Sequence, residues 1–121
     1  MTNTPKEKRP DRLSVTHREV DGIQVVALHG EVDHDVQDVF SRALLAGEDR
    51  APLRTVVDLS GVTFMDSSGI NVIVAAHRRA AGARGWLRIA GAQGFVLRVL
   101  QIVGLDDLIP CHPTVEQALT A

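Results

Sequence analysis

The sequence predicts a single α/β domain with a mixed, mostly parallel sheet and helices packed against it. Segments typical of strands alternate with segments of helical periodicity, in the order β-β-α-β-α-β-α-β-α. The 121 residues suit one domain, and a composition that is 45% hydrophobic but only 3% aromatic predicts an aliphatic core. We expect the domain to span residues 12–121. Residues 1–11, rich in proline, lysine and threonine, are expected to form a disordered tail.

The first elements are predicted to be a hairpin followed by a helix. From Leu13 the side chains alternate with period two, which is typical of a half-buried strand. Asp21-Gly22 is a strong hairpin-turn signal, and the apolar run Ile23 to His29 predicts the second strand. Asp33 is a good N-cap for a first amphipathic helix, which we expect to end at Gly47.

The second half of the chain predicts three strands and three helices, marked by buried apolar runs and by glycine or proline at their ends. In order we expect a central parallel strand at Thr55–Leu59, a turn at Ser60-Gly61, a helix from Ser67 to about Ala81, a strand at Trp86–Ile89, a helix from Phe95 to Val103 closed by Gly104, a short strand at Leu108-Ile109, and a last helix capped by Thr114.

Charge and cysteine content limit the classes of partner and compartment. The formal net charge of −2 gives no long-range attraction for nucleic acid or for an acidic membrane. The single cysteine, Cys111, allows no internal disulfide, which suits a reducing cytoplasm. No apolar run approaches the ~20 residues of a membrane helix, and no signal peptide is visible. We therefore expect a cytoplasmic monomer or weak dimer with no membrane span and no nucleic-acid partner.

The polar stretch Asp66-Ser67-Ser68-Gly69 lies where the central strand is expected to become a helix. Asp66 or Ser67 can simply cap the helix, since a helix start leaves backbone N–H groups without partners. A hydrolase nucleophile is disfavoured, because neither serine stands in Gly-x-Ser-x-Gly and no histidine is placed beside it by the sequence. The adjacent pair Cys111-His112 lacks metal-ligand spacing. We expect no enzyme activity, no metal and no cofactor.

Two motifs give a specific resemblance. "GEVDHD" (residues 30–35) and "VVDLSGVTFMDSSGINVIV" (residues 56–74) closely resemble the STAS domain of bacterial anti-sigma factor antagonists. The resemblance implies a protein that binds a serine-kinase anti-sigma factor and so releases a sigma factor. It also implies that the kinase switches the antagonist off by phosphorylating Ser68, and that a PP2C-type phosphatase removes the phosphate. Ser67 matches the serine that is not modified, and Asp33 and Asp66 match acidic positions of the recognition surface.

The resemblance places the recognition surface at the start of the helix that carries Ser68. A phosphate there adds about −1.5 to −2 charges at pH 7, and a helix N-terminus accommodates negative charge. We therefore expect phosphorylation to block the interface without unfolding the domain. The alternative is a cytosolic STAS subunit of a signalling complex or of a lipid-transport ABC system, without a phosphoswitch. The expected partner-binding residues are Asp33, His34, Asp66, Ser67, Ser68, Gly69 and Asn71.

Overall fold

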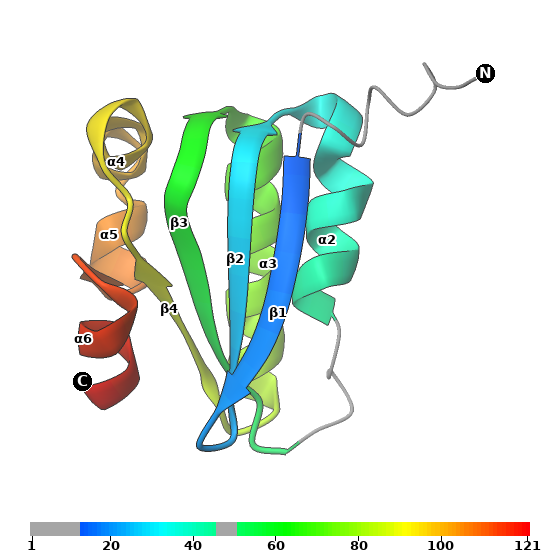
Figure 1. Cartoon of the computed structure of the whole chain (residues 1–121), viewed down its shortest axis with the longest axis vertical. Helices are drawn as coiled ribbons and strands as arrows, with labels where there is room; N and C mark the ends of the chain where they lie inside the picture. The colour runs from blue at the N-terminus through cyan, green and yellow to red at the C-terminus, as the bar shows by residue number, and fades with distance from the viewer. Residues whose placement is uncertain (1–12, 46–50) are drawn as a thin grey trace.

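A computed structural model describes residues 13–45 and 51–121, and in this part of the chain five strands form one sheet in the order β1-β2-β3-β4-β5 (Figure 1). The predicted tail and the predicted helix end at Gly47 lie outside the described residues. The elements are β1 (Leu13–Val20), β2 (Ile23–Val32), the 3-10 helix η2 (His34–Val36), α2 (Gln37–Leu45), β3 (Arg54–Met65), α3 (Ser67–Gly82), β4 (Trp86–Ala90), α4 (Gly94–Ile102), α5 (Leu105–Leu108), β5 (Cys111–His112) and α6 (Val115–Thr120).

The predicted hairpin is confirmed. β1 and β2 are antiparallel and pair from Leu13 with Gly30 to Val20 with Ile23. Asp21 and Gly22 connect them with φ angles of 52° and 81°. Positive φ at both central residues is the requirement of the tight turn that matches strand twist, which explains the Asp-Gly pair. The remaining neighbours, β2 with β3, β3 with β4 and β4 with β5, are parallel as predicted.

The central strand β3 is longer than predicted, and the predicted turn at Ser60-Gly61 is wrong. β3 continues through both residues to Met65, while its register against β2 shifts near His29. A Cβ built on Gly61 would overlap the His29 ring and crowd the Leu28 carbonyl oxygen. Glycine is therefore needed here for close strand approach at an irregularity and not for chain reversal.

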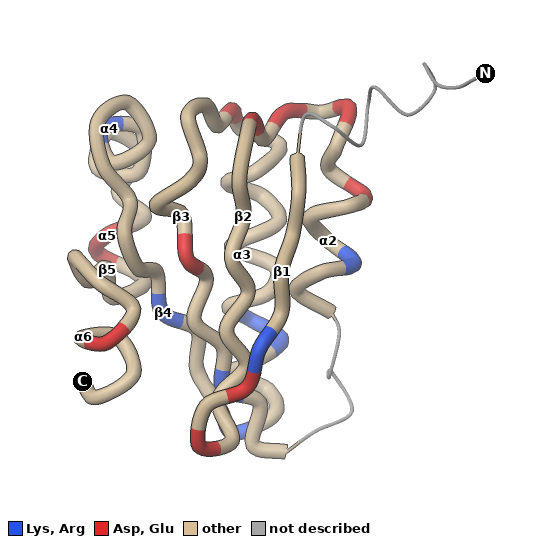
Figure 2. Tube along the Cα trace, viewed as in Figure 1, with Lys and Arg blue, Asp and Glu red and all other residues tan. Residues whose placement is uncertain are grey.

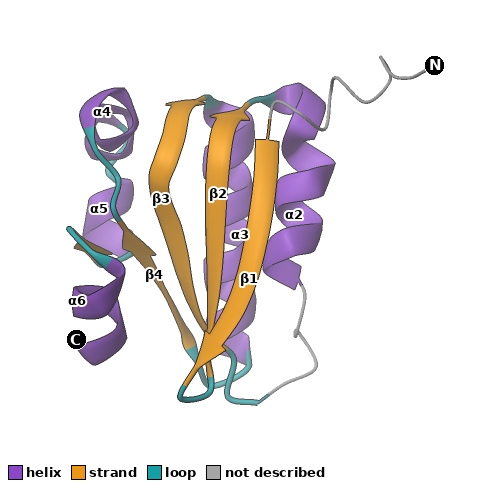
Figure 3. Ribbon diagram, viewed as in Figure 1, coloured by secondary structure: helices purple, strands orange, loops and turns teal. Residues whose placement is uncertain are grey.

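The sheet separates two apolar clusters, and α2 and α3 lie together against one of its faces (Figure 3). The larger cluster lies on the side of α2 and α3 and also includes residues of α4 and α5. Alternation along the strands explains this, because Val26 and Leu28 of β2 and Val57 and Leu59 of β3 point to the same side. The smaller cluster lies on the opposite face, where Ala118 of α6 packs with other buried residues. Burial is therefore concentrated around β2 and β3, which carry the motif residues at their ends.

The last third of the chain agrees with prediction except at one element. α4 ends before Gly104, whose φ of 77° is left-handed, and the Thr114 hydroxyl oxygen accepts the Gln117 N–H at 3.1 Å as the cap of α6. The predicted strand at Leu108-Ile109 is wrong: Leu108 closes the short helix α5, and the strand is β5. Ile109 is fully buried. An apolar pair is too short to show a period, so the sequence alone fits a buried strand and the end of a helix equally well.

Candidate functional site

The candidate site lies where β2 and β3 end side by side. Val32 pairs with Met65 in the parallel register, so the next residues, Asp33 and Asp66, leave the sheet next to each other. The Asp66 backbone N–H donates to the Val32 carbonyl oxygen at 3.2 Å, which continues the ladder by one step. We call the surface formed by residues 31–35, 64–71 and 93–95 the C-terminal edge of the sheet.

Asp66 is the N-cap of α3, which is one of the two caps that the sequence left open. Its Oδ1 accepts the Ser68 backbone N–H at 2.8 Å, and its carbonyl oxygen accepts the N–H groups of Gly69 and Ile70 at 3.1 and 3.3 Å. The backbone of Asp66 is extended, with φ −111° and ψ −169°, as an N-cap requires. Ser67 is therefore not the cap but the first helical residue, and Ser68 is the second.

Ser67 and Ser68 differ in exposure. Ser67 is exposed, whereas Ser68 is half-buried beside the cap. Both lie in the first turn of α3, where backbone N–H groups point out of the helix and the helix dipole is positive. Negative charge added at this turn meets a favourable helix terminus, but it also meets the Asp66 carboxylate.

Gly69 sets how closely α3 approaches the sheet. Gly69 is buried, and a Cβ at this position would lie 2.8 Å from both Met65 Cγ and Val32 Cγ1. Ordinary carbon contacts are about 3.5–4.0 Å. Only glycine therefore lets the helix start rest directly on the ends of β2 and β3, and this packing fixes the position of Ser68.

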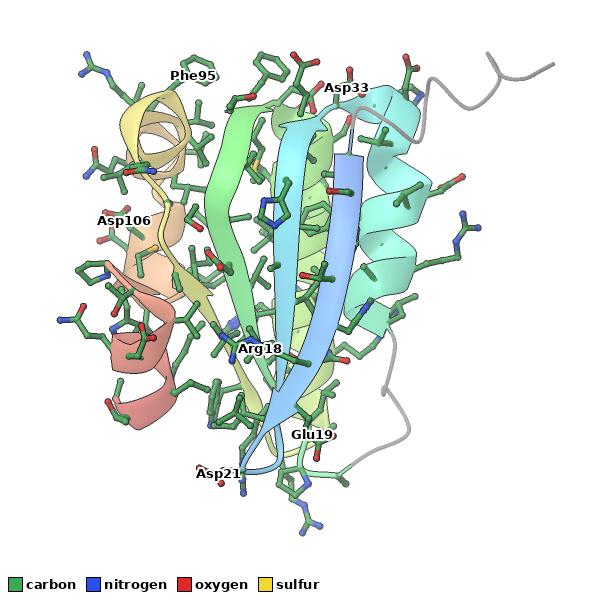
Figure 4. All side chains as sticks on the ribbon, in the orientation of Figure 1. Arg18, Glu19, Asp21, Asp33, Phe95 and Asp106 are labelled. Carbon is green, nitrogen blue, oxygen red and sulfur yellow. The ribbon has the colours of Figure 1, made fainter. Side chains whose placement is uncertain are left out.

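The other half of the site follows β2. Asp33 caps η2, since its Oδ1 accepts the Asp35 N–H at 3.0 Å and its carbonyl oxygen accepts the Val36 N–H at 3.2 Å. Asp33 is half-buried and His34 is exposed. Figure 2 shows acidic residues gathered at this end of the molecule, and Figure 4 labels Asp33 there. They include Glu31, Asp33, Asp35, Asp38 and Asp66.

All seven residues predicted for partner binding belong to this edge. Asn71 is exposed in the first turns of α3, whereas Gly69 is buried and can act only through the backbone or through packing. Of the apolar residues that follow, Val72 and Ile73 are buried, while Ile70 and Val74 are half-buried against the core. Ile70 and Val74 therefore contribute to the packing of the domain.

An aromatic pair that was not predicted from the sequence lies at the same edge. The rings of Phe64 and Phe95 are stacked, with centroids 5.7 Å apart and planes 9° apart. The side chains are 38% and 54% exposed. The two residues are 31 positions apart, and only the packing of α4 against β3 brings them together. The sequence offered one signal for this pair: aromatic residues are scarce, and Phe64 stands within the motif of residues 56–74.

In the described part of the chain, no histidine hydrogen-bonds to the Ser68 hydroxyl, which a nucleophilic serine requires. A cavity of about 320 Å³ lies elsewhere, among Arg18, Asp58 and the start of α6. His77 of α3 is half-buried, and its Nδ1 is buried without a hydrogen-bond partner among the described residues.

Within residues 13–45 and 51–121, no group of three or more histidine, cysteine, aspartate or glutamate side chains is placed to hold a metal ion. None of the helices in these ranges has the length and apolar character needed to cross a membrane.

Comparison with known proteins gives one family over nearly the whole chain. The sequence model of the STAS domain matches residues 14–118. The anti-sigma-F factor antagonist RsfA of Mycobacterium tuberculosis is 30% identical over 113 residues, covering 90% of this chain and 87% of that protein. An anti-sigma factor antagonist from Mycobacterium paratuberculosis has a crystal structure with a TM-score of 0.82 at 30% identity, covering 92% of this chain and 94% of the other.

A more distant structure shows the same fold. The Bacillus cell fate determinant SpoIIAA, solved in its phosphorylated form, superposes with a TM-score of 0.61 at 22% identity and covers 88% of this chain and 97% of its own. The family match, the two 30% identical relatives and the five-stranded sheet agree with one another. The chain therefore belongs to the STAS-domain family of anti-sigma factor antagonists.

Proposed function

We propose that this protein binds a serine-kinase anti-sigma factor through the C-terminal edge, releases a sigma factor, and is switched off when that kinase phosphorylates Ser68. A PP2C-type phosphatase restores binding by removing the phosphate. The process takes place in the bacterial cytoplasm, and the proposed contact residues are the seven predicted from the sequence. The observation that most directly supports this proposal is the position of Ser68 in the first turn of α3, on the edge that Asp33 and Asp66 share.

The position of Ser68 supports a switch that works on the surface. A phosphate at the first turn of α3 gains from the helix terminus, which typically contributes about 0.3–1 kcal/mol for an exposed charge. Repulsion from the Asp66 carboxylate acts in the opposite direction and is of similar size in a solvated setting. The two effects offset each other, so the modified domain stays folded. A partner packed on the edge has no such compensation and must accommodate the bulk and about two negative charges.

The relatives support the same proposal. The mycobacterial protein at 30% identity is named as an antagonist of an anti-sigma factor. The SpoIIAA structure is of a phosphorylated form, so at least one protein of this fold carries the modification.

Mass spectrometry of the protein from its native host tests the modification. The expected result is a phosphate on the peptide that contains Met65 to Gly69, assigned to Ser68 and lost in Ser68→Ala. An unmodified peptide under growth and stress alike would leave a constitutive STAS binding module, such as a subunit of a signalling complex.

Matched substitutions test the switch. Ser68→Asp should lose kinase binding while its melting temperature stays close to that of Ser68→Ala. Ala75 provides the control, because Ala75→Asp adds the same charge at an exposed residue of the same helix, outside the C-terminal edge. A large drop in stability for Ser68→Asp would show that charge acts by unfolding, and equal binding by both aspartate variants would remove Ser68 as the switch.

A further inference from the structure

We propose that the stacked Phe64–Phe95 pair is the apolar anchor of the kinase interface and a determinant of which anti-sigma factor binds. The inference rests on the function proposed above and names a contact that lies outside the serine motif. The partner it requires is a kinase surface with an apolar pocket positioned beside the site that receives Ser68.

The few aromatic side chains of this chain are unevenly placed. It has three phenylalanines, one tryptophan and no tyrosine. Phe40 is fully buried, and the Trp86 ring is half-buried with the Arg88 guanidinium 3.6 Å from its centroid. Phe64 and Phe95 remain, and both are exposed. Half of the aromatic residues are therefore paired on the surface at one edge.

The Phe64–Phe95 pair is continuous with the C-terminal edge. Phe64 stands two residues before the cap Asp66, and Phe95 is the second residue of α4. The Gln93 side-chain amide donates to the Ser60 carbonyl oxygen at 3.5 Å, which holds the start of α4 near β3. Figure 4 shows Phe95 at the same end of the molecule as Asp33. The ring pair therefore extends this edge from the start of α3 to α4.

A protein interface is wider than the start of one helix. A stable complex buries about 800 Å² on each partner, which corresponds to a patch roughly 28 Å across. The start of α3 alone is narrower than this, since an α-helix with its side chains is about 10–12 Å in diameter. A kinase centred on Ser68 must therefore cover neighbouring elements, and the aromatic pair lies within that reach.

Exposed, stacked rings are also energetically suited to anchoring a partner. With 54% of its side chain exposed, Phe95 contributes less to the core than a buried aromatic does. The apolar area that Phe95 leaves exposed in the free domain contributes its burial free energy when a partner covers it. Stacking fixes both rings in advance, so little side-chain entropy is lost on binding. Aromatic residues held in this way are typical of the few positions that dominate binding energy.

Substitution on one helix tests the proposal. Phe95→Ala is compared with Ile102→Ala, because Ile102 is also exposed, at 77%, and ends the same helix about 10 Å further along. The serine-kinase anti-sigma factors of the host are purified and titrated calorimetrically with each variant. We expect Phe95→Ala to weaken binding by about thirty-fold, the size typical of an interface anchor, and Ile102→Ala to leave it within two-fold.

Thermal unfolding separates anchoring from a structural role. Phe95→Ala should keep a melting temperature close to that of the wild type, whereas a ring that only joins α4 to β3 would lower it and leave the affinity of the folded protein unchanged. Phe95→Leu keeps apolar volume but removes the stacked ring, so it serves if the alanine variant unfolds. We expect an intermediate loss of affinity for this variant.

The outcomes also distinguish the inference from the function on which it rests. If a kinase binds the wild type and binds the folded Phe95 variants equally well, the anchor is refuted and the proposed function stands. If no host kinase binds the wild type at micromolar concentration, the proposed function fails and the anchor fails with it.

Discussion

Replacing Gly69 by alanine should destabilise the domain, although alanine is the better helix former. The new Cβ would lie 2.8 Å from Val32 Cγ1 and from Met65 Cγ, and 3.2 Å from Met65 Sδ. Val32 and Met65 are 0% and 1% exposed, so neither side chain can move into solvent. Valine is stiff at χ1, whereas methionine can partly adjust.

The magnitude is a difference between two opposing effects. Overpacking a core costs about 1–3 kcal/mol, and exchanging glycine for alanine within a helix returns up to about 1 kcal/mol. The net loss for Gly69→Ala is therefore about 1 kcal/mol. For a domain of 121 residues this corresponds to a fall in Tm of about 4 °C.

The same helix supplies the control. Gly82 is the last residue of α3, and a Cβ there meets nothing within 4 Å. Gly82→Ala should therefore raise stability by about 0.5–1 kcal/mol. Urea unfolding of both variants measures the two differences. A Gly69→Ala protein as stable as the wild type would refute the argument that close packing, and not helix geometry, requires glycine at the start of α3.

Substitutions at three further residues test other parts of the structure. Asp66→Ala removes the carboxylate that accepts the Ser68 N–H, and should cost about 1 kcal/mol in urea unfolding, while Asp66→Asn should restore most of it. Burial first and the Asp106 charge second raise the pKa of the Cys111 thiol above its ordinary value of 9.0. The free energy of unfolding therefore keeps its full contribution from the neutral Cys111 thiol below pH 9. This contribution falls as the pH rises further, because the thiol ionises at a lower pH in the unfolded chain than in the folded one. Iodoacetamide rates against pH should show a higher midpoint in the folded chain, and Asp106→Asn should lower it. Arg88→Ala removes the 2.8 Å hydrogen bond that the Arg88 guanidinium donates to the Ala118 carbonyl oxygen of α6. The guanidinium also lies over the ring of Trp86, the only tryptophan, so in this variant the Trp86 fluorescence should change before global unfolding. A fluorescence transition that coincides with global unfolding would contradict this.

Local signals were sufficient for much of the fold. Asp21-Gly22 predicts its turn because both residues tolerate positive φ, and Asp33 predicts a helix start because an aspartate side chain accepts a backbone N–H. These rules depend on a few neighbouring residues, which a single sequence contains in full. The candidate serines were placed at the start of a helix for the same reason.

The errors concern residues whose roles depend on distant partners. Gly61 resembles a turn residue, yet its role is to make room for His29 on the neighbouring strand. Leu108 and Ile109 form an apolar pair too short to show a period, so packing decides that the first ends a helix. No local pattern pairs Phe64 with Phe95, because tertiary contact alone brings them together.

The register that places Asp33 beside Asp66 has a consequence for the phosphorylation of Ser68 that we propose above. The start of α3 exists as a shaped surface only while β2 and β3 are paired and Gly69 rests on both. A short peptide that spans residues 60–75 lacks β2 and cannot hold this conformation. A kinase acting on Ser68 would therefore recognise the folded surface and not the local sequence alone. The unfolded chain would be a poor substrate. Newly synthesised protein would then escape modification until its central strands had assembled.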